Sequence, residues 1–129
     1  MDLNNPVIKL CLAGTQAEFE HRLDDAHRLY LQAWELATDD YEACIAAHYV
    51  ARHQATPQAT LHWNQIALDR AEADDADRAE QADQHDRVGG FYPSLYLALG
   101  RAHEVLGHHA EAQQYYDRAA KLGIVHLID

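Results

Sequence analysis

Histidine is frequent in this sequence, with ten copies in 129 residues, and its side chain can bind metals or move protons. A zinc site on one helix needs two histidines four positions apart. No pair has this spacing: His48 and His53 are five apart, and His108 and His109 are adjacent. A meeting of His48 and His53 with His103 across helices is the remaining route to a site. We expect no metal site, and histidines that are neutral and exposed or half-buried.

The spacing of the other reactive residues does not indicate a catalytic site. The sequence has neither a glycine-rich phosphate loop nor a nucleophile elbow, and Ser94 is its one serine. Ser94 follows Pro93 at an expected helix start, where capping or first-turn placement explains it. Sets of tyrosine, histidine and glutamate arise by chance in any helical protein of this size. The sequence therefore predicts no enzyme, no catalytic residue and no cofactor.

The formal net charge is −11 with histidines neutral, and this charge disfavours anionic partners. Nucleic acids and anionic membranes both require clusters of lysine and arginine, so we expect neither as a partner. No apolar run approaches the roughly 20 residues that span a bilayer, and the first residues lack a basic leader. Cys11 and Cys44 have no metal or redox spacing and are expected to be buried free thiols. We expect a cytoplasmic protein.

The elements that position these residues are expected to be helices, because no segment sustains an alternation of apolar and polar residues. Asn5 before Pro6, and Asp39 three residues before Glu42, are helix-start signals. The pair at 89–90 is a glycine break. Helices are expected over about 6–21, 23–37, 39–54, from 57 onward, 93–107 and 109–122.

A period of 34 residues groups these helices into pairs. Gly14, His48 and Gly100 occupy equivalent positions, each 12 residues before the first member of a matching set on the next helix. The sets are Ala26, Leu29, Tyr30 and Ala33; Thr60, Trp63, Asn64 and Ala67; and Ala112, Tyr115, Tyr116 and Ala119. The third set follows the second by 52 residues, one period plus 18. Small residues let paired helices approach closely, and aromatic residues fill the space beside them.

This pattern resembles the tetratricopeptide repeat, whose helix–turn–helix units have about 34 residues. The third repeat matches best, through Tyr96, Leu99, Gly100, Ala112, Tyr116 and Ala119. The second departs from the pattern, because His48 replaces a small residue, Thr60 an alanine and Asn64 an aromatic residue. The resemblance implies one all-α domain over residues 1–129, a right-handed array of three antiparallel helix pairs at about 7–38, 41–74 and 93–124.

Residues 69–87 form an acidic insertion with eight acidic and three basic side chains. Alanine and glutamine favour a helix here, and large apolar residues are absent. We expect a solvated helical extension and a loop over about 69–92, with a flexible linker as the alternative. The segment lacks the glycine and final glutamate of a calcium loop. A docking site for a basic partner is a further alternative.

Ligands of tetratricopeptide proteins usually lie on a concave face formed by the first helix of each pair. The resemblance carries this face over to three stripes: Cys11, Thr15, Glu18 and Phe19; Ile45, Tyr49, Arg52 and His53; and Leu97, Arg101, Glu104 and Val105. The apolar members are expected to form its floor: Cys11, Phe19, Ile45, Leu97 and Val105. Arg52 and Arg101 are expected to hold a carboxylate by paired hydrogen bonds. Alternatively, they pair with Glu18 and Glu104 and leave a neutral groove.

The sequence thus predicts a protein–protein interaction module that binds a peptide or helix of a partner in this groove. Tyr49, Arg52 and Arg101 are its expected polar anchors. Two alternatives stay open. One is a small-ligand or metal-binding protein, or an enzyme, that uses Tyr49, His53 and Arg101. The other is a structural subunit that assembles through its apolar end, residues 124–129, as in a homodimer.

Overall fold

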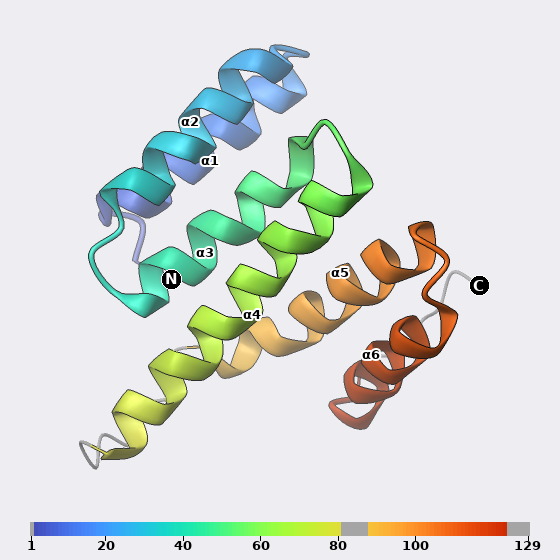
Figure 1. Cartoon of the computed structure of the whole chain (residues 1–129). Helices are drawn as coiled ribbons and strands as arrows, with labels where there is room; N and C mark the ends of the chain where they lie inside the picture. Colours follow the sequence, from blue (N-terminus) through green and yellow to red (C-terminus); the bar gives the residue numbers. More distant parts are fainter. Residues whose placement is uncertain (1, 81–87, 124–129) are drawn as a thin grey trace.

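The computed structural model describes residues 2–80 and 88–123, which form six α-helices and two short 3-10 helices and contain no strand (Figure 1). The α-helices are α1 (Pro6–Phe19), α2 (Leu23–Leu36), α3 (Asp40–Val50), α4 (Pro57–Glu80), α5 (Tyr92–Val105) and α6 (His109–Lys121). The 3-10 helices are η1 (Ala51–His53) and η2 (Gly89–Phe91). The expected all-helical fold is confirmed for these residues.

The helix starts follow the capping residues of the sequence. The Asn5 side chain accepts a hydrogen bond from the backbone N–H of Val7 at 2.8 Å. Asp39 Oδ1 accepts one from the backbone N–H of Glu42, also at 2.8 Å. Each bond satisfies a donor in the first turn that has no partner inside the helix.

Several helix ends differ by a few residues from the expected ones. α5 begins at Tyr92, one residue before Pro93, since a proline in the first turn loses no helical hydrogen bond. The helix expected to reach about residue 54 keeps α geometry only to Val50 and continues as η1.

The longest helix, α4, has 24 residues and carries the first part of the acidic insertion as far as Glu80 (Figure 1). Among the residues described, no helix combines the length and the apolar character that crossing a bilayer requires. Residues 81–87 of the insertion and the apolar end 124–129 lie outside the described residues. The expected loop and the homodimer through that end therefore stay predictions.

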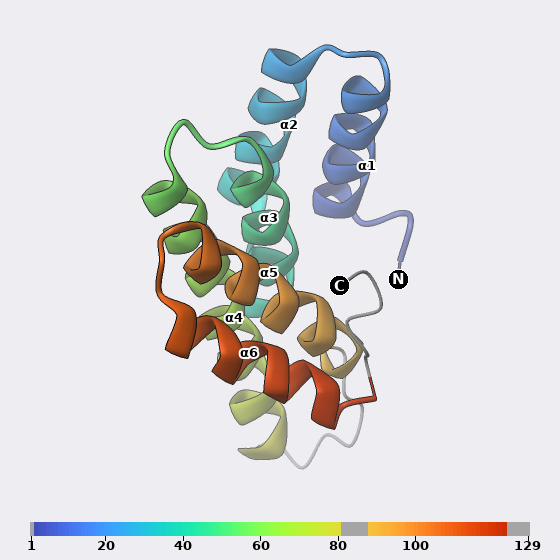
Figure 2. The same cartoon turned by 90° about the vertical axis from the view of Figure 1, so that its right-hand side faces the viewer.

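Consecutive helices pack as three hairpins: α1 with α2, α3 with α4, and α5 with α6 (Figures 1 and 2). The hairpins follow one another in chain order. α3 contacts both helices of the first hairpin, and α4 contacts α5, so neighbouring hairpins share packed surfaces. The middle hairpin therefore has a neighbour on each side.

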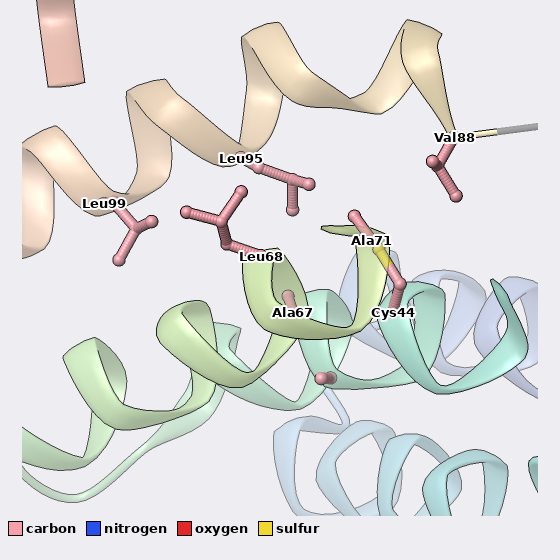
Figure 3. Packing of buried hydrophobic residues seen from close by; sticks show 8 residues of the cluster. Cys44, Ala67, Leu68, Ala71, Val88, Leu95 and Leu99 are labelled. Atoms are coloured by element: carbon pink, nitrogen blue, oxygen red, sulfur yellow. The ribbon is translucent and has the colours of Figure 1, made fainter. Parts of the chain in front are cut away.

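The core lies in clusters of buried apolar side chains between the helices. One cluster joins α3, α4 and α5 through Cys44, Ala67, Leu68, Leu95 and Leu99 (Figure 3). Its alanines let the helix backbones approach closely, while its leucines fill the remaining space. This cluster holds α5 against the middle hairpin.

Cys11 and Cys44 are free thiols, and each is 1% exposed, as expected from the sequence. Burial raises the pKa of both thiols to about 12. Both therefore stay protonated at neutral pH, and they act as small apolar residues of the core.

Candidate binding groove

A groove of about 700 Å³ lies where α3, η1 and the start of α4 face α5. Its lining residues are His48, Ala51, Arg52, Gln54, Ala55, Thr56, Pro57, Thr60, Asn64, Ser94, Ala98, Arg101, Ala102 and Val105. Most of them belong to helices, so the backbone holds the polar side chains at fixed intervals.

The groove differs in charge from the chain as a whole. Arg52 and Arg101 line it, and no aspartate or glutamate does. The whole chain has 21 acidic residues and a net charge of −11. A concave site with two cations and no carboxylate attracts anionic groups.

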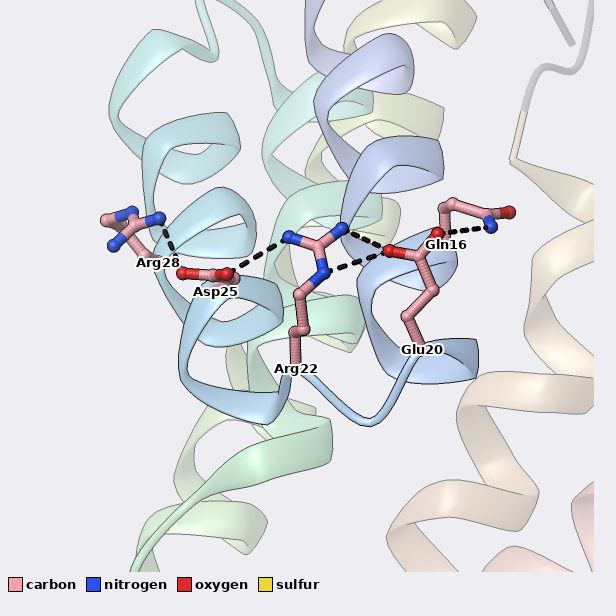
Figure 4. A network of polar contacts seen from close by, with 5 residues as sticks. All are labelled: Gln16, Glu20, Arg22, Asp25 and Arg28. Carbon is pink, nitrogen blue, oxygen red and sulfur yellow. Dashed lines mark hydrogen bonds and ion pairs between the residues drawn. The ribbon is translucent and has the colours of Figure 1, made fainter.

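Arg101 is the one arginine in the described part of the chain that makes no hydrogen bond, ion pair or ring contact there. The other arginines have partners: Arg22 and Arg28 with Asp25, Arg52 with Glu18, Arg70 with Asp40, Arg78 with Asp74, and Arg118 with the ring of Tyr115. Figure 4 shows the first of these groups, a surface network that spans the turn between α1 and α2. By contrast, the exposed guanidinium of Arg101 keeps all its donors for a ligand.

Arg52 belongs to a polar cluster around Glu18. The Nε and Nη2 atoms of Arg52 donate to the two carboxylate oxygens of Glu18, at 3.0 and 2.7 Å. The Tyr30 hydroxyl also donates to Glu18, and His53 Nε2 lies 3.3 Å from the same carboxylate. The hydrogen bond from Arg52 is the main cause that lowers the pKa of Glu18 to about 2. The carboxylate is therefore ionised at neutral pH and fixes the Arg52 guanidinium.

The pairing expected in the neutral-groove alternative is found for Arg52 and, among the described residues, not for Arg101. Arg52 pairs with Glu18, as in the neutral-groove alternative. Arg101 forms no ion pair with Glu104 or with any other residue of 2–80 and 88–123. The groove therefore keeps one arginine that is not neutralised.

The ten candidate residues fall into four places rather than one surface. Two line the groove: Arg52 and Arg101. Two line a neighbouring cavity of about 140 Å³: Ile45 and Tyr49. Three belong to the polar cluster near the Tyr30 hydroxyl: Thr15, Glu18 and His53. Three line neither hollow: Phe19, Leu97 and Glu104.

Of the five residues expected to form the apolar floor, only Val105 lines the groove. Cys11 and Ile45 are 1% and 5% exposed and pack in the core between α1, α2 and α3. Phe19 and Val105 are 78% and 71% exposed at the ends of their helices. A periodic stripe keeps one direction along its helix, but neighbouring helices cover only part of that length. Residues of one stripe therefore range from core to open surface.

Most groove residues were outside the sequence-based site, and the most informative of them are His48, Thr60 and Asn64. They are the three positions at which the second repeat departs from the pattern of the other two. Polar residues had replaced small or aromatic ones there, and that departure was the signal that could have placed them in the site. Asn64 is 5% exposed, and its carboxamide has no hydrogen-bond partner among the described residues.

The histidines do not gather into a metal site. His103 Nδ1 lies 3.0 Å from Nδ1 of His108 across the turn between α5 and α6, whereas His53 lies beside Glu18. Within the described ranges, no three side chains of histidine, cysteine, aspartate or glutamate form a group that could hold a metal ion. The meeting of His48 and His53 with His103 is not found.

A second hollow, of about 720 Å³, lies between the α2–α3 connection and α4 and has mostly acidic charges. Its arginines are already paired: Arg70 with Asp40 at 2.9 Å and Arg78 with Asp74 at 3.3 Å. Asp74 is buried at 4% exposure, and the two ion pairs leave no unpaired cation among the described residues that line this hollow. We therefore place the candidate site in the groove.

Comparisons with family models, with curated proteins and with solved structures find no match for this chain.

Proposed function

We propose that the chain is a protein–protein interaction module of the tetratricopeptide type, which binds an acidic peptide segment of a partner protein in the groove. It acts by recognition and performs no catalysis. One observation carries the proposal: the groove has two arginines and no acidic residue, in a chain with a net charge of −11. Opposite charge favours encounter of an acidic segment with the groove.

The helix arrangement supports the tetratricopeptide part of the proposal. Three hairpins follow one another in chain order, and a glycine faces a tyrosine at the same position of the first and the third. A right-handed rotation from each hairpin to the next would place α1, α3 and α5 on one concave face. The groove contains residues of α3 and α5, as that arrangement requires.

Arg101 provides the main contact with the acidic segment in this proposal. Its planar guanidinium can donate two parallel hydrogen bonds to one carboxylate. Arg52 adds a second positive charge, which its bidentate contact with Glu18 holds on the α3 side of the groove. Its charge is partly compensated there, so we assign Arg52 the smaller share of the affinity.

A random peptide library selected against the purified chain tests the proposal. We expect the selected sequences to be rich in aspartate and glutamate, and their affinity to fall with rising salt concentration. Arg101→Ala should weaken the best peptide about tenfold, as the loss of a charge-assisted hydrogen-bond pair implies. Fluorescence polarisation of the labelled peptide measures this change.

Arg28→Ala is the matched control. Arg28 is also an exposed helical arginine, but it pairs with Asp25 and does not line the groove. This variant changes the net charge equally, so it should bind the peptide like the wild type. Selection of neutral or basic peptides, or equal losses in the two variants, would contradict the proposal.

A further inference from the structure

In the two outer hairpins, α1 with α2 and α5 with α6, the helices pack without free space at the point where they cross. A Cβ atom added to Gly14 would lie 2.3 Å from Cε1 of Tyr30, and one added to Gly100 would lie 2.5 Å from Cε1 of Tyr116. The tyrosine ring therefore fills the space that the glycine leaves. Neither crossing has room for another group.

The middle hairpin has different residues at the same two positions, His48 on α3 and Asn64 on α4. Both line the groove, together with Thr60 one helical turn before Asn64. We term these three residues the polar notch. Where the outer hairpins place an aromatic ring, the middle hairpin thus presents hydrogen-bonding groups to an open groove.

Asn64 has a largely buried side chain whose amide atoms still reach the groove, and beside it the enclosed Nδ1 atom of His48 has no hydrogen-bond partner among the described residues. Asn64 is only 5% exposed, and its carboxamide makes no hydrogen bond with residues 2–80 and 88–123. Most buried polar side chains are hydrogen-bonded. Since Asn64 lines the groove, a group bound there can supply the partner.

The notch is neutral and offers both donors and acceptors. The carboxamide of Asn64 has both kinds of atom. Burial, and to a smaller extent Arg52, lowers the pKa of His48, so its imidazole is neutral at pH 7 with one donor and one acceptor nitrogen. The Thr60 hydroxyl donates to the Thr56 carbonyl at 3.3 Å and keeps an acceptor lone pair.

These groups select among ligand chemistries. A carboxylate can only accept hydrogen bonds and an ammonium can only donate them, so each would match half of the notch. An amide has both a donor and an acceptor in one plane and matches a carboxamide. The core holds α4 in place, because Ala67 and Leu68 follow Asn64 by one turn and pack there (Figure 3).

We propose that the polar notch is a specificity pocket for an amide group of the bound peptide segment, next to the acidic side chain held by Arg101. This inference rests on the proposed function. The amide comes either from the side chain of an asparagine or glutamine in the segment or from its backbone.

Small amides test the notch separately from the acidic peptide. The isotope-labelled chain is titrated with acetamide, which has a side-chain amide, and with N-methylacetamide, which has a backbone amide. Acetate and methylammonium are the charged controls. NMR follows the side-chain NH2 group of Asn64, with that of the exposed Gln113, bonded to Asp117 at 2.8 Å, as the reference.

We expect the amides to cause a saturable shift at Asn64 and none at Gln113, and the tighter of the two amides identifies the source. No response to either amide, or an equal response to acetate or methylammonium, would overturn the proposal. Neither result affects the binding of acidic peptides through Arg101, so the two proposals fail separately.

Two variants remove the amide of Asn64 from the notch. Asn64→Leu replaces the amide by an apolar side chain of similar size, and His48→Gly with Asn64→Tyr restores the pair of the outer hairpins. Circular dichroism checks that each is folded, and the backbone N–H of Ala67 reports binding. We expect amide binding about tenfold weaker in both. A folded variant that binds the amide like the wild type would overturn the proposal.

Discussion

In the outer hairpins, a glycine on the first helix and a tyrosine on the second are in contact at the crossing. In the middle hairpin, His48 and Asn64 occupy the same positions and face a groove. The outer crossings bury apolar surface, which stabilises the fold. The middle one encloses the Nδ1 atom of His48 without a hydrogen-bond partner among the described residues, which costs stability. One repeat can thus serve a ligand while its neighbours hold the stack together.

The two kinds of crossing also differ in how their polar atoms are satisfied. The Tyr30 hydroxyl donates to Glu18, which in turn accepts two hydrogen bonds from Arg52. This cluster joins α1, α2 and η1. Asn64 has no such partner among the described residues. The polar atoms of the first crossing therefore contribute to the fold, and those of the middle crossing remain for a ligand.

Exchanging residues between the crossings should produce the largest change in the free energy of unfolding. Tyr30 is 0% exposed, and Tyr30→Asn brings the middle residue into the first hairpin. We expect the free energy of unfolding to fall by about 3–5 kcal/mol, because a buried ring is lost and an amide is buried. Chemical denaturation measures the change. A loss below about 1 kcal/mol would show that the ring does not close this crossing.

A smaller loss is expected where a methyl group is added at an outer crossing. Gly14→Ala and Gly100→Ala each push a Cβ into a tyrosine ring. We expect a net loss of about 1–3 kcal/mol from overpacking, although alanine favours a helix by about 1 kcal/mol.

Gly90→Ala is the matched control for both glycine variants, since a Cβ there would meet no atom within 4 Å. Thermal unfolding should show no loss for this variant. If all three variants unfolded at the same temperature, the close approach at the outer crossings would be unimportant for stability.

The polar cluster around Glu18 should make the free energy of unfolding depend on pH. The pKa of Glu18 is lowered from 4.5 to about 2 by hydrogen bonds, first of all from Arg52. Its stabilising contribution is complete above about pH 4.5 and is lost as the pH falls to about 2. Glu18→Gln should lower the free energy of unfolding at pH 7 by about 1–2 kcal/mol, since solvent screens the half-exposed Arg52.

Denaturation of the wild type and of Glu18→Gln over a pH series measures this difference. The two curves should converge as the pH falls through the range from 4.5 to about 2. A constant gap over that range would show that the ionised carboxylate does not hold the cluster.

The helices were predictable from local signals, because caps such as Asn5 and Asp39 act within one turn. The pair of Glu18 and Arg52 was also within reach, since the two residues are 34 positions apart, one period. The lining of the groove was not predictable, because the exposure of Ile45 and Phe19 depends on how far neighbouring helices extend along α3 and α1. Helical periodicity gives the direction of a side chain but not what covers it.

The departures from the repeat carried more information about the site than the matches did. Matching residues such as Gly100 are explained by packing, and packing recurs in every hairpin. Asn64 and His48 break the pattern at positions that pack in the neighbouring hairpins, and both line the groove. Sequence alone could not show that a hollow lies beside them.

Asn64→Leu, measured for both stability and binding, tests the central claim most directly. We expect the free energy of unfolding to rise by about 1 kcal/mol, because a largely buried side chain without a hydrogen bond to the described residues is replaced by an apolar one. In the same variant, the affinity for the selected acidic peptide should fall about tenfold. A variant that binds the peptide as tightly as the wild type, or one that is less stable than the wild type, would contradict a middle crossing kept polar for a ligand.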